Sequence, residues 1–377
     1  MAIILNGIET SFMQQALNLA ETARGKTSPN PTVGAVIVRD NRVIGQGYHA
    51  RAGADHAEVA AIKDAEGDVA GATVFVTLEP CCHTGRTGPC SRALIESGVS
   101  RVVIASMDPS PKVDGKGAAE LREAGIAVDV LECSLAERAR SQNEDFRKHS
   151  VTGLPFVLFK SAMSLDGKIA TGTGDSQWIS GEDSRALVHE LRAGYDAIAV
   201  GSGTAAADDP MLTCRLPGEH RQPLRVVFDS AAGLSPDSKL VKTAAEVPTL
   251  VFTTEAAAPE RVQALRGAGV EVEALPAVNG RVDAAEAMRS LGSREVPVLS
   301  VMLEGGPGLA ASFVEAGLID KVMFFIAPKI LGGESARTPV EGSGFSRVDD
   351  ALILYRMKHE EVGEDILITA YTTEEGY

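Results

Sequence analysis

The stretch TLEPCCHTGRTGPC, residues 77–90, sets the fold expected for the first half of the chain. It follows a short β-branched strand, predicted over residues 73–78, and runs into a helix predicted over residues 90–97 and closed by Gly98. Just upstream, DHAE at residues 55–58 opens another helix, predicted over residues 56–66. Strands and helices that alternate in this way predict an α/β sandwich.

Three side chains of this region form a zinc-binding pattern: His56, Cys81 and Cys90. One imidazole and two thiolates suit Zn²⁺, and three protein ligands leave the fourth position for water. Zinc lowers the pKa of a bound water from about 15.7 to about 7, so a neighbouring group must carry a proton. Glu58 lies two residues from a ligand and is placed to carry that proton without binding zinc. The order H-x-E and then P-C is typical of zinc-dependent base deaminases.

The spacing of the cysteines leaves an alternative open. Base deaminases usually have P-C-x-x-C, whereas eight residues separate Cys81 from Cys90. An insertion of this length predicts a loop beside the metal that carries His83 and Arg86 toward a substrate. Alternatively, Cys82 or His83 is a fourth ligand that closes a structural site, although a closed site has no need of the neighbouring carboxylate.

Alternating strands and helices continue along the whole chain. In the first half we predict further helices over 10–24, 120–124 and 134–149, and further strands over 32–38, 42–48, 101–105 and 126–131. In the second half we predict strands over 156–161, 197–200, 224–228, 249–253, 270–274, 297–303, 321–326 and 366–371, with helices over 184–192, 259–266, 284–291 and 309–316. A polar stretch, 142–150, is followed by Gly153 and Pro155, and predicts domains 1–150 and 151–377.

Composition narrows the class of protein. The 377 residues carry a formal net charge of −15, which disfavours nucleic-acid binding, because such binding depends on lysine and arginine. No apolar run reaches the roughly 18 residues that a membrane span needs. The N-terminus lacks the basic start and the cleavage site of a secretory signal, so we expect a cytoplasmic protein. With nucleic acid disfavoured, we expect an enzyme that acts on small molecules. Three of the five cysteines cluster within ten residues, which indicates metal or redox chemistry rather than a disulfide framework.

Two glycine-containing stretches stand out in the second half. Residues 201–206, GSGTAA, resemble a dinucleotide fingerprint, but Asp208-Asp209-Pro210 interrupts the helix that the fingerprint requires. The stretch EGGPG, residues 304–308, links an apolar strand to a predicted helix, and N–H groups at a helix start can bind a phosphate. On the residues alone, a plain turn explains EGGPG equally well.

The motifs together resemble the riboflavin-biosynthesis bifunctional deaminase–reductase family. The resemblance rests on SPNPTVG (28–34), HAE (56–58), the stretch 77–90, SLDGK (164–168), SQWI (176–179), DDPMLT (208–213) and EGGP (304–307), and it spans nearly the whole chain. The long cysteine spacing is that family's own pattern. The resemblance implies a cytidine-deaminase-like α/β/α domain followed by a dihydrofolate-reductase-like α/β domain.

The family's chemistry assigns further residues by motif. The first domain would deaminate 2,5-diamino-6-ribosylamino-4(3H)-pyrimidinone 5′-phosphate with zinc, and the second would reduce the ribose of the product to ribityl with NADPH. In the deaminase pocket the resemblance implies that Asn30, His49 and Arg86 bind substrate; alternatively Asn30, between two prolines, only shapes a turn. It also implies a homo-oligomer formed through the reductase domain.

In the reductase domain the resemblance implies two groups of contacts. NADPH would contact Ala162, Trp178, Thr204, Asp208, Ser230, Gly306, Pro307, Gly308, Leu309, Ala310, Ala311 and Ser312. The substrate would contact Ser176, Arg192, Leu212, Arg215 and Glu304. Alternatively Trp178 is a core residue and the two arginines are solvated surface charges. A general acid for the reduction is left open between Lys160 and Asp166.

Three other functions are also compatible with the sequence. A nucleoside or nucleic-acid deaminase with an unrelated appendage would act on cytidine. A zinc-stabilised binding module would have no turnover at all, and one of the two domains could lack activity. Assays of ammonia release and of the Glu58 variant separate these possibilities.

Overall fold

The computed structural model describes residues 5–83, 88–218 and 220–377. The chain forms two units, Met1–Gly153 together with Tyr377, and Leu154–Gly376. The predicted boundary after residue 150 falls inside helix α6 (Glu144–Thr152). Gly153 ends this helix in the left-handed conformation (φ 71°), which glycine adopts without strain. The second unit begins at the next residue, Leu154.

A five-stranded sheet forms the middle layer of the first unit, in the order β2-β1-β3-β4-β5. Its strands are β1 (Gly34–Arg39), β2 (Arg42–Tyr48), β3 (Thr73–Val76), β4 (Arg101–Ile104) and β5 (Ala127–Val130). Strand β1 is antiparallel to both β2 and β3, whereas β3, β4 and β5 are parallel. The other helices of this unit are α1 (Gly7–Glu21), α2 (Ala57–Asp64), α3 (Cys90–Glu96), α4 (Lys116–Glu123) and α5 (Ser134–Gln142).

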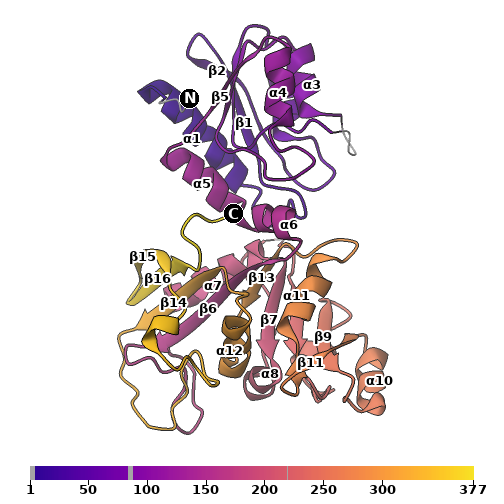
Figure 1. The fold of residues 1–377 in the computed structure, drawn as a ribbon, viewed down its shortest axis with the longest axis vertical. Helices are drawn as coiled ribbons and strands as arrows, with labels where there is room; N and C mark the ends of the chain where they lie inside the picture. The colour runs from indigo at the N-terminus through magenta and orange to yellow at the C-terminus, as the bar shows by residue number, and fades with distance from the viewer. Residues whose placement is uncertain (1–4, 84–87, 219) are drawn as a thin grey trace. The chain divides into compact units, whose positions relative to one another are not determined.

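Helices cover both faces of this sheet (Figure 1). Apolar residues of α1 and α5 form one core with one face of β1, β3 and β4, among them Met13, Leu17 and Phe75. Residues of α2, α3 and α4 form a second core with the opposite face, among them Ala61 and Leu94. Successive strand residues alternate between the two cores, as strand geometry requires. The predicted α/β/α sandwich is confirmed.

The helix predicted over 134–149 is two helices, α5 and α6, so that prediction was wrong. The break falls at Asn143, whose φ of −126° is not helical. Its side-chain oxygen accepts the backbone N–H of Thr32 at 2.7 Å, and its amide donates to the carbonyl of Thr32 at 2.9 Å. This contact, 111 residues away in the sequence, holds the N-terminal loop and could not be read from the helical pattern.

The second unit is built on a nine-stranded sheet in the order β10-β9-β8-β7-β13-β6-β14-β16-β15. Its strands are β6 (Phe156–Ser164), β7 (Ala197–Gly201), β8 (Leu224–Phe228), β9 (Thr249–Thr254), β10 (Glu271–Leu275), β13 (Ser300–Leu303), β14 (Lys321–Ala327), β15 (Tyr355–Val362) and β16 (Asp365–Tyr371). Neighbours from β10 to β14 are parallel, and β16 is antiparallel to both β14 and β15. A short antiparallel pair, β11 (Ala277–Val278) and β12 (Arg281–Val282), lies outside this sheet.

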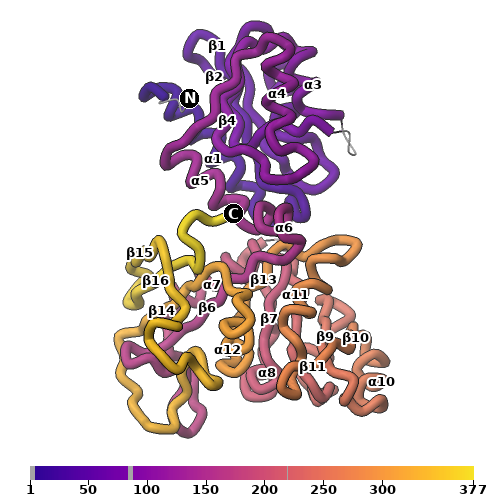
Figure 2. The backbone as a smooth tube through the Cα atoms, viewed as in Figure 1, coloured from indigo at the N-terminus to yellow at the C-terminus, as the bar shows by residue number. Residues whose placement is uncertain are grey.

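Helices also cover both faces of the larger sheet, and Figure 2 traces the chain between them. They are α7 (Glu182–Gly194), α8 (Ser202–Asp208), α9 (Lys239–Lys242), α10 (Pro259–Gly267), α11 (Ala284–Gly292) and α12 (Pro307–Glu315), with a 3-10 turn at Val348–Asp350. Residues of α11 and α12 form one core against the sheet, and residues of α7 to α10 form the other. No helix in the described part of the chain is both long and apolar enough to cross a membrane.

Two local features of this unit bear on the predictions. Helix α8 ends at Asp208, and Asp209 adopts a left-handed conformation (φ 38°), so the predicted interruption of the glycine fingerprint is confirmed. Strand β15 was not predicted. It lies at the edge of the sheet, and seven of its eight residues are exposed, so its sequence lacks the alternation of a half-buried strand.

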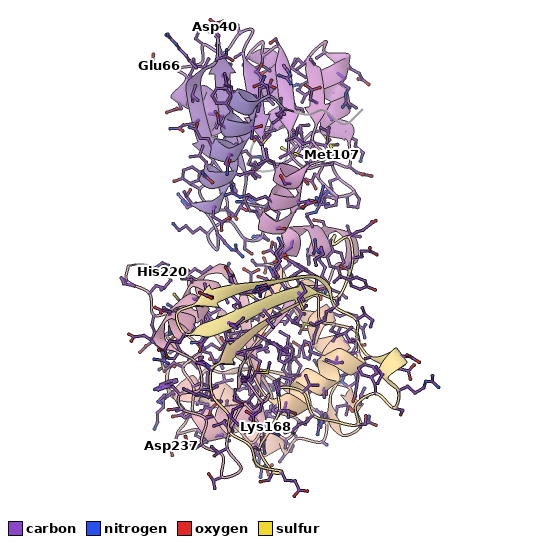
Figure 3. The ribbon with its side chains drawn as sticks, turned by 90° about the vertical axis from the view of Figure 1, so that its left-hand side faces the viewer. Asp40, Glu66, Met107, Lys168, His220 and Asp237 are labelled. Atoms are coloured by element: carbon purple, nitrogen blue, oxygen red, sulfur yellow. The ribbon has the colours of Figure 1, made fainter. Side chains whose placement is uncertain are left out.

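The C-terminal ends of the parallel strands lie along one side of each sheet, and the candidate sites lie beside these strand ends. In Figure 3 Asp40 marks the turn between β1 and β2, and Met107, which follows β4, lies toward the other end of that sheet. In the second unit Lys168 and Asp237 follow β6 and β8, at the end opposite His220, which precedes β8 (Figure 3).

Candidate active sites

Three elements of the first unit bring the predicted zinc ligands together. His56 immediately precedes α2, Cys81 lies in the loop after β3, and Cys90 is the first residue of α3. Their ligand atoms all lie within 4.8 Å of one another. Nδ1 of His56 is 3.2 Å from Sγ of Cys90 and 3.5 Å from Sγ of Cys81. These separations fit one tetrahedral zinc ion, whose bonds to nitrogen and sulfur are about 2.0–2.3 Å long.

The pKa values of the two thiols are shifted in opposite directions. A hydrogen bond from the Cys90 thiol lowers the pKa of Cys81 to about 4, and the same bond, together with burial, raises the pKa of Cys90. The backbone N–H of Cys90, at the start of α3, also donates to Sγ of Cys81 at 3.4 Å. The pair therefore holds one thiolate by itself, and a divalent cation would stabilise the second.

Glu58 lies in the first turn of α2 and is only 3% exposed. Burial first, and then the negative charge of Cys81, raise the pKa of Glu58 to about 7. The carboxyl group lies beside Cys90 but is not one of the clustered ligands. A buried carboxyl with a pKa near neutrality can both accept and return a proton.

The structural alternative for this site required a fourth ligand. The thiol of Cys82 instead points to the carbonyl of Lys112, at 3.7 Å, and His83 is exposed. Among the described residues, the metal-binding cluster holds His56, Cys81 and Cys90 alone. Three ligands beside a buried carboxyl form an open site, which is the arrangement of catalytic zinc.

Asn30 and His49, implied to bind substrate, lie beside this cluster. Nδ2 of Asn30 is 3.0 Å from Nε2 of His49, and the rings of His49 and His56 are 5.3 Å apart at an interplanar angle of 77°. The carbonyl of Asp55 contacts Nδ1 of His49 at 3.0 Å. His49 is 3% exposed, and burial lowers its pKa, so the ring is neutral at pH 7. Arg86 lies outside the described residues.

In the second unit Glu304 is the centre of a buried charge cluster. It follows β13, and its two carboxylate oxygens accept Nε and Nη2 of Arg192 at 2.6 and 2.7 Å. Nζ of Lys160, on β6, lies 3.5 Å from the same carboxylate. Burial favours a raised pKa for Glu304, but Arg192 and then Lys160 outweigh it and lower the pKa to about 2. Arg192 is therefore paired with Glu304, and is not a surface charge.

The other implied substrate contacts lie on segments around this cluster. Nη1 of Arg192 also donates to the carbonyl of Thr213, at 3.3 Å, and so ties α7 to the segment that carries Arg215. Leu212 is 2% exposed and packs in the core. Ser176 is half-buried in the loop before α7.

The EGGPG stretch forms an open cradle at the start of α12. Gly305 (φ 100°) and Gly306 (φ 84°) both adopt conformations that favour glycine. A Cβ atom at Gly306 would lie 3.4 Å from both the backbone nitrogen of Gly201 and Oγ1 of Thr204. The bare backbone beside a hydroxyl, at the ends of β7 and β13, fits the phosphates of a nucleotide cofactor. Residues 307–312, implied to bind NADPH, form the first turns of α12.

The remaining residues implied for NADPH lie at several strand ends. Ser230 follows β8, and its hydroxyl accepts the N–H of Val282 at 3.1 Å. Asp208 ends α8, and burial raises its pKa. Ala162 lies on β6. Trp178 is 62% exposed, and the Arg185 guanidinium stacks on its ring at 4.8 Å, so the alternative that it is a core residue was wrong.

Asp166 serves a structural purpose in this unit. Its carboxylate accepts the hydroxyl of Ser164 at 2.6 Å and the N–H groups of Leu331 and Gly332 at 3.0 and 2.7 Å. The Ser164 hydroxyl and then these backbone donors lower the pKa of Asp166 to about 2. A group so occupied is a poor general acid, which leaves Lys160 as the candidate.

Comparison with known proteins identifies both units. The cytidine and deoxycytidylate deaminase zinc-binding region matches residues 8–106, and the RibD C-terminal domain matches residues 155–368. Riboflavin biosynthesis protein RibD of Actinobacillus pleuropneumoniae is 44% identical over 360 residues, which cover 96% of this chain and 94% of the relative. The chain belongs to the RibD family.

Other members of the RibD family match equally completely. RibD of Aquifex aeolicus is 40% identical, with 97% of this chain and 99% of the relative covered. A solved structure from Thermotoga maritima, described as a diaminohydroxyphosphoribosylaminopyrimidine deaminase/5-amino-6-(5-phosphoribosylamino)uracil reductase, is 36% identical with a TM-score of 0.83, covering 97% of this chain and 98% of that one. RibD family membership makes the first unit a zinc-binding deaminase domain and the second a reductase domain of riboflavin biosynthesis.

Sequence reasoning missed two features of this RibD site pair. It did not identify His189, which contacts Arg215 and lies three residues before Arg192, a helical spacing that places both on one face of α7. It also missed Glu79, whose buried carboxylate accepts the N–H groups of Gly115 and Ala118 at 3.1 and 3.0 Å, at the start of α4. No local pattern indicates a contact between residues 79 and 118.

Proposed function

We propose that this chain carries out two successive reactions of riboflavin biosynthesis. The first is hydrolytic deamination of 2,5-diamino-6-ribosylamino-4(3H)-pyrimidinone 5′-phosphate, and the second is NADPH-dependent reduction of the ribose of the product to ribityl. The observation that carries the proposal is the open three-ligand cluster beside buried Glu58, in a chain that also holds the Lys160–Arg192–Glu304 cluster.

In the deaminase domain, different residues are proposed to bind zinc, to transfer the proton and to bind the substrate while an amino group is replaced by oxygen. Zinc, held by His56, Cys81 and Cys90, would supply a water molecule of lowered pKa. Water must lose a proton and the departing nitrogen must gain one, and Glu58 lies where it can accept the first and return it as ammonia leaves. The Asn30–His49 pair supports recognition of the pyrimidine edge, because an amide and a neutral imidazole each donate and accept hydrogen bonds. Arg86 is proposed to bind the phosphate.

The reductase residues must hold two ligands and supply a proton. NADPH, held by the cradle at 306–312 with Thr204, Ser230, Asp208, Ala162 and Trp178, would supply the hydride equivalent. Reduction of the ribosylamine to ribitylamine also consumes one proton. Lys160 is the proposed donor, because burial lowers its pKa and Glu304 keeps it beside the substrate residues. Ser176, Leu212 and Arg215 are proposed to hold the substrate, with Arg192 fixed by Glu304.

The deciding experiment measures ammonia release and NADPH oxidation by the wild type and by Glu58→Gln. Removing the proton carrier should slow ammonia release by about 10²-fold or more, while zinc content and reduction of the deaminated substrate are unchanged. Cytidine should release no ammonia, in contrast to a nucleoside deaminase. Deamination by Glu58→Gln at the wild-type rate would contradict the proposal and favour a zinc-stabilised binding module.

Self-association through the reductase domain is the remaining part of the proposal. Apolar side chains are exposed along and before the edge strand β15, with Ile353 at 56%, Met357 at 70% and Val348 at 89% exposure. Exposed apolar surface on an edge strand favours pairing with another chain. Sedimentation of the wild type should show a dimer or larger species, and Met357→Glu should shift it toward the monomer. A monomeric wild type would contradict it.

A cytoplasmic location is also proposed. None of the five cysteines is in a disulfide, and a reducing compartment keeps Cys81 and Cys90 available for metal binding.

A further inference from the structure

His189 lies beside the charge cluster of the reductase domain, and neither the sequence motifs nor the proposed function assigns it a role. It is on α7, one turn before Arg192. Nε2 of His189 lies 3.2 Å from Nη2 of Arg215. Arg192 reaches the carbonyl of Thr213, two residues before Arg215, so the same helix face contacts this segment twice.

The protonation state of His189 follows from its neighbours. A guanidinium only donates hydrogen bonds, so Nε2 must accept, which assigns the proton of the ring to Nδ1. Burial, and then the positive charges of Arg192 and Arg215, lower the pKa of His189; Glu304 and the Thr213 backbone oppose this. The ring is therefore a neutral acceptor for Arg215.

The charges around His189 are unevenly paired. Glu304 takes up both Arg192 and Lys160. Arg215 is exposed, and within the described residues it has no carboxylate at ion-pair distance. Among the described residues, Arg192 and Lys160 thus share one carboxylate and Arg215 has none, in a chain whose overall charge is −15.

A neutral acceptor suits a cation that must bind an anion. A carboxylate at position 189 would hold the guanidinium more firmly, but it would cancel the charge and repel a phosphate. An imidazole nitrogen orients the guanidinium while its charge and its other N–H donors stay available. Arginine binds phosphate through paired donors, so its orientation determines the strength of binding.

We propose that His189 is a positioning residue, which holds Arg215 in the orientation that receives the phosphate group of the reductase substrate. This inference rests on the proposed function, because it takes the substrate to be a phosphorylated ribosylaminopyrimidine. It adds the residue that determines how strongly the phosphate is recognised.

Three substitutions at position 189 test the inference in the full-length enzyme, with NADPH saturating. His189→Leu removes the acceptor and should raise the reductase KM for the phosphorylated substrate about 10-fold, with kcat within about twofold. His189→Gln keeps a neutral acceptor at similar reach and should stay within about threefold of the wild-type KM. His189→Glu keeps an acceptor but adds a negative charge, and should raise KM at least as much as His189→Leu.

Three controls separate positioning from a general structural effect. Ammonia release by the same preparations reports on the other domain and should not change. His220→Leu alters a half-buried histidine whose Nε2 lies 3.0 Å from the carbonyl of Pro217, and it should leave the reductase KM unchanged. The dephosphorylated substrate should show the same KM with every variant, because it lacks the group that Arg215 binds.

Calorimetric binding of ribose 5-phosphate gives a readout that needs no turnover. His189→Leu should weaken this binding, and His189→Gln should largely restore it. Unchanged binding and unchanged KM in His189→Leu would overturn the inference. Equal loss of kcat in all three variants would also overturn it, because it would show that His189 only supports the fold. A wild type that binds ribose 5-phosphate but does not oxidise NADPH would instead refute the proposed function, and weaker binding by His189→Leu would then still show that His189 positions Arg215 for a phosphate group.

Discussion

At the scale of single residues, the second domain depends on a carboxylate that lies among cations. Glu304 is buried, and the side chains of Lys160 and Arg192 are only 14% and 12% exposed. Removing one partner of a buried ion pair leaves the other charge without compensation, which costs about 3–5 kcal/mol. The bidentate geometry with Arg192 also fixes the end of β13, where the proposed cofactor cradle begins.

We therefore expect Glu304→Gln to destabilise the reductase domain by about 3–5 kcal/mol and to abolish NADPH oxidation. The pKa of Glu304 is lowered from 4.5 to about 2, so its stabilising effect is complete above pH 4.5 and is lost as the pH falls toward 2. Thermal unfolding of the wild type and the variant at several pH values tests this. The difference between them should shrink below pH 4.5; a constant difference would contradict the assignment.

At the scale of elements, the position of α2 depends on the absence of side chains in β2. A Cβ atom at Gly47 would lie 2.5 Å from the backbone nitrogen of Ala61 and 2.7 Å from the carbonyl oxygen of Ala57. Helix α2 therefore packs backbone against backbone on this strand. Because His56 and Glu58 are at the start of α2, this close approach places both the predicted zinc ligand and the proposed proton carrier.

Gly47→Ala should move α2 away from β2, lower the stability of the deaminase domain by about 1–3 kcal/mol and reduce both zinc content and ammonia release. The reductase rate should stay at its wild-type value. Gly7→Ala is the matched control, since nothing lies within 4 Å of a Cβ atom at that position. Full activity of Gly47→Ala would show that the site tolerates a shift of α2.

At the scale of the whole molecule, each unit buries its own apolar cores on both sides of its own sheet. A domain with its own core can unfold as a separate cooperative unit. Ligands that bind one folded unit should stabilise that unit alone, by mass action.

Calorimetry of the full chain should therefore show two unfolding transitions. Removing zinc with a chelator should lower the temperature of one transition and abolish ammonia release, while NADPH should raise the temperature of the other. Glu304→Gln should shift only the transition that NADPH shifts. A single transition that responds to both treatments would contradict independent unfolding.

The sequence by itself predicted the alternation of strands and helices, the cluster of His56, Cys81 and Cys90, and the neighbouring Glu58. These features are local: a strand alternates with period two, a helix begins at a recognisable residue, and His56 and Glu58 are two residues apart. Cys81 and Cys90 each lie near an element end, and parallel strands bring such ends to one edge. The spacing therefore carried enough information to predict which three side chains would cluster.

Only the tertiary structure decided which side chains, far apart in the sequence, contact one another. Lys160, Arg192 and Glu304 meet because β6 and β13 are neighbours and α7 lies across them, an order that no local pattern encodes. The same is true of Asn143, which breaks a predicted helix to bind Thr32, and of His189 beside Arg215. Such contacts join residues far apart in the sequence, and their energies depend on burial and partner charge, which exist only once the chain is folded.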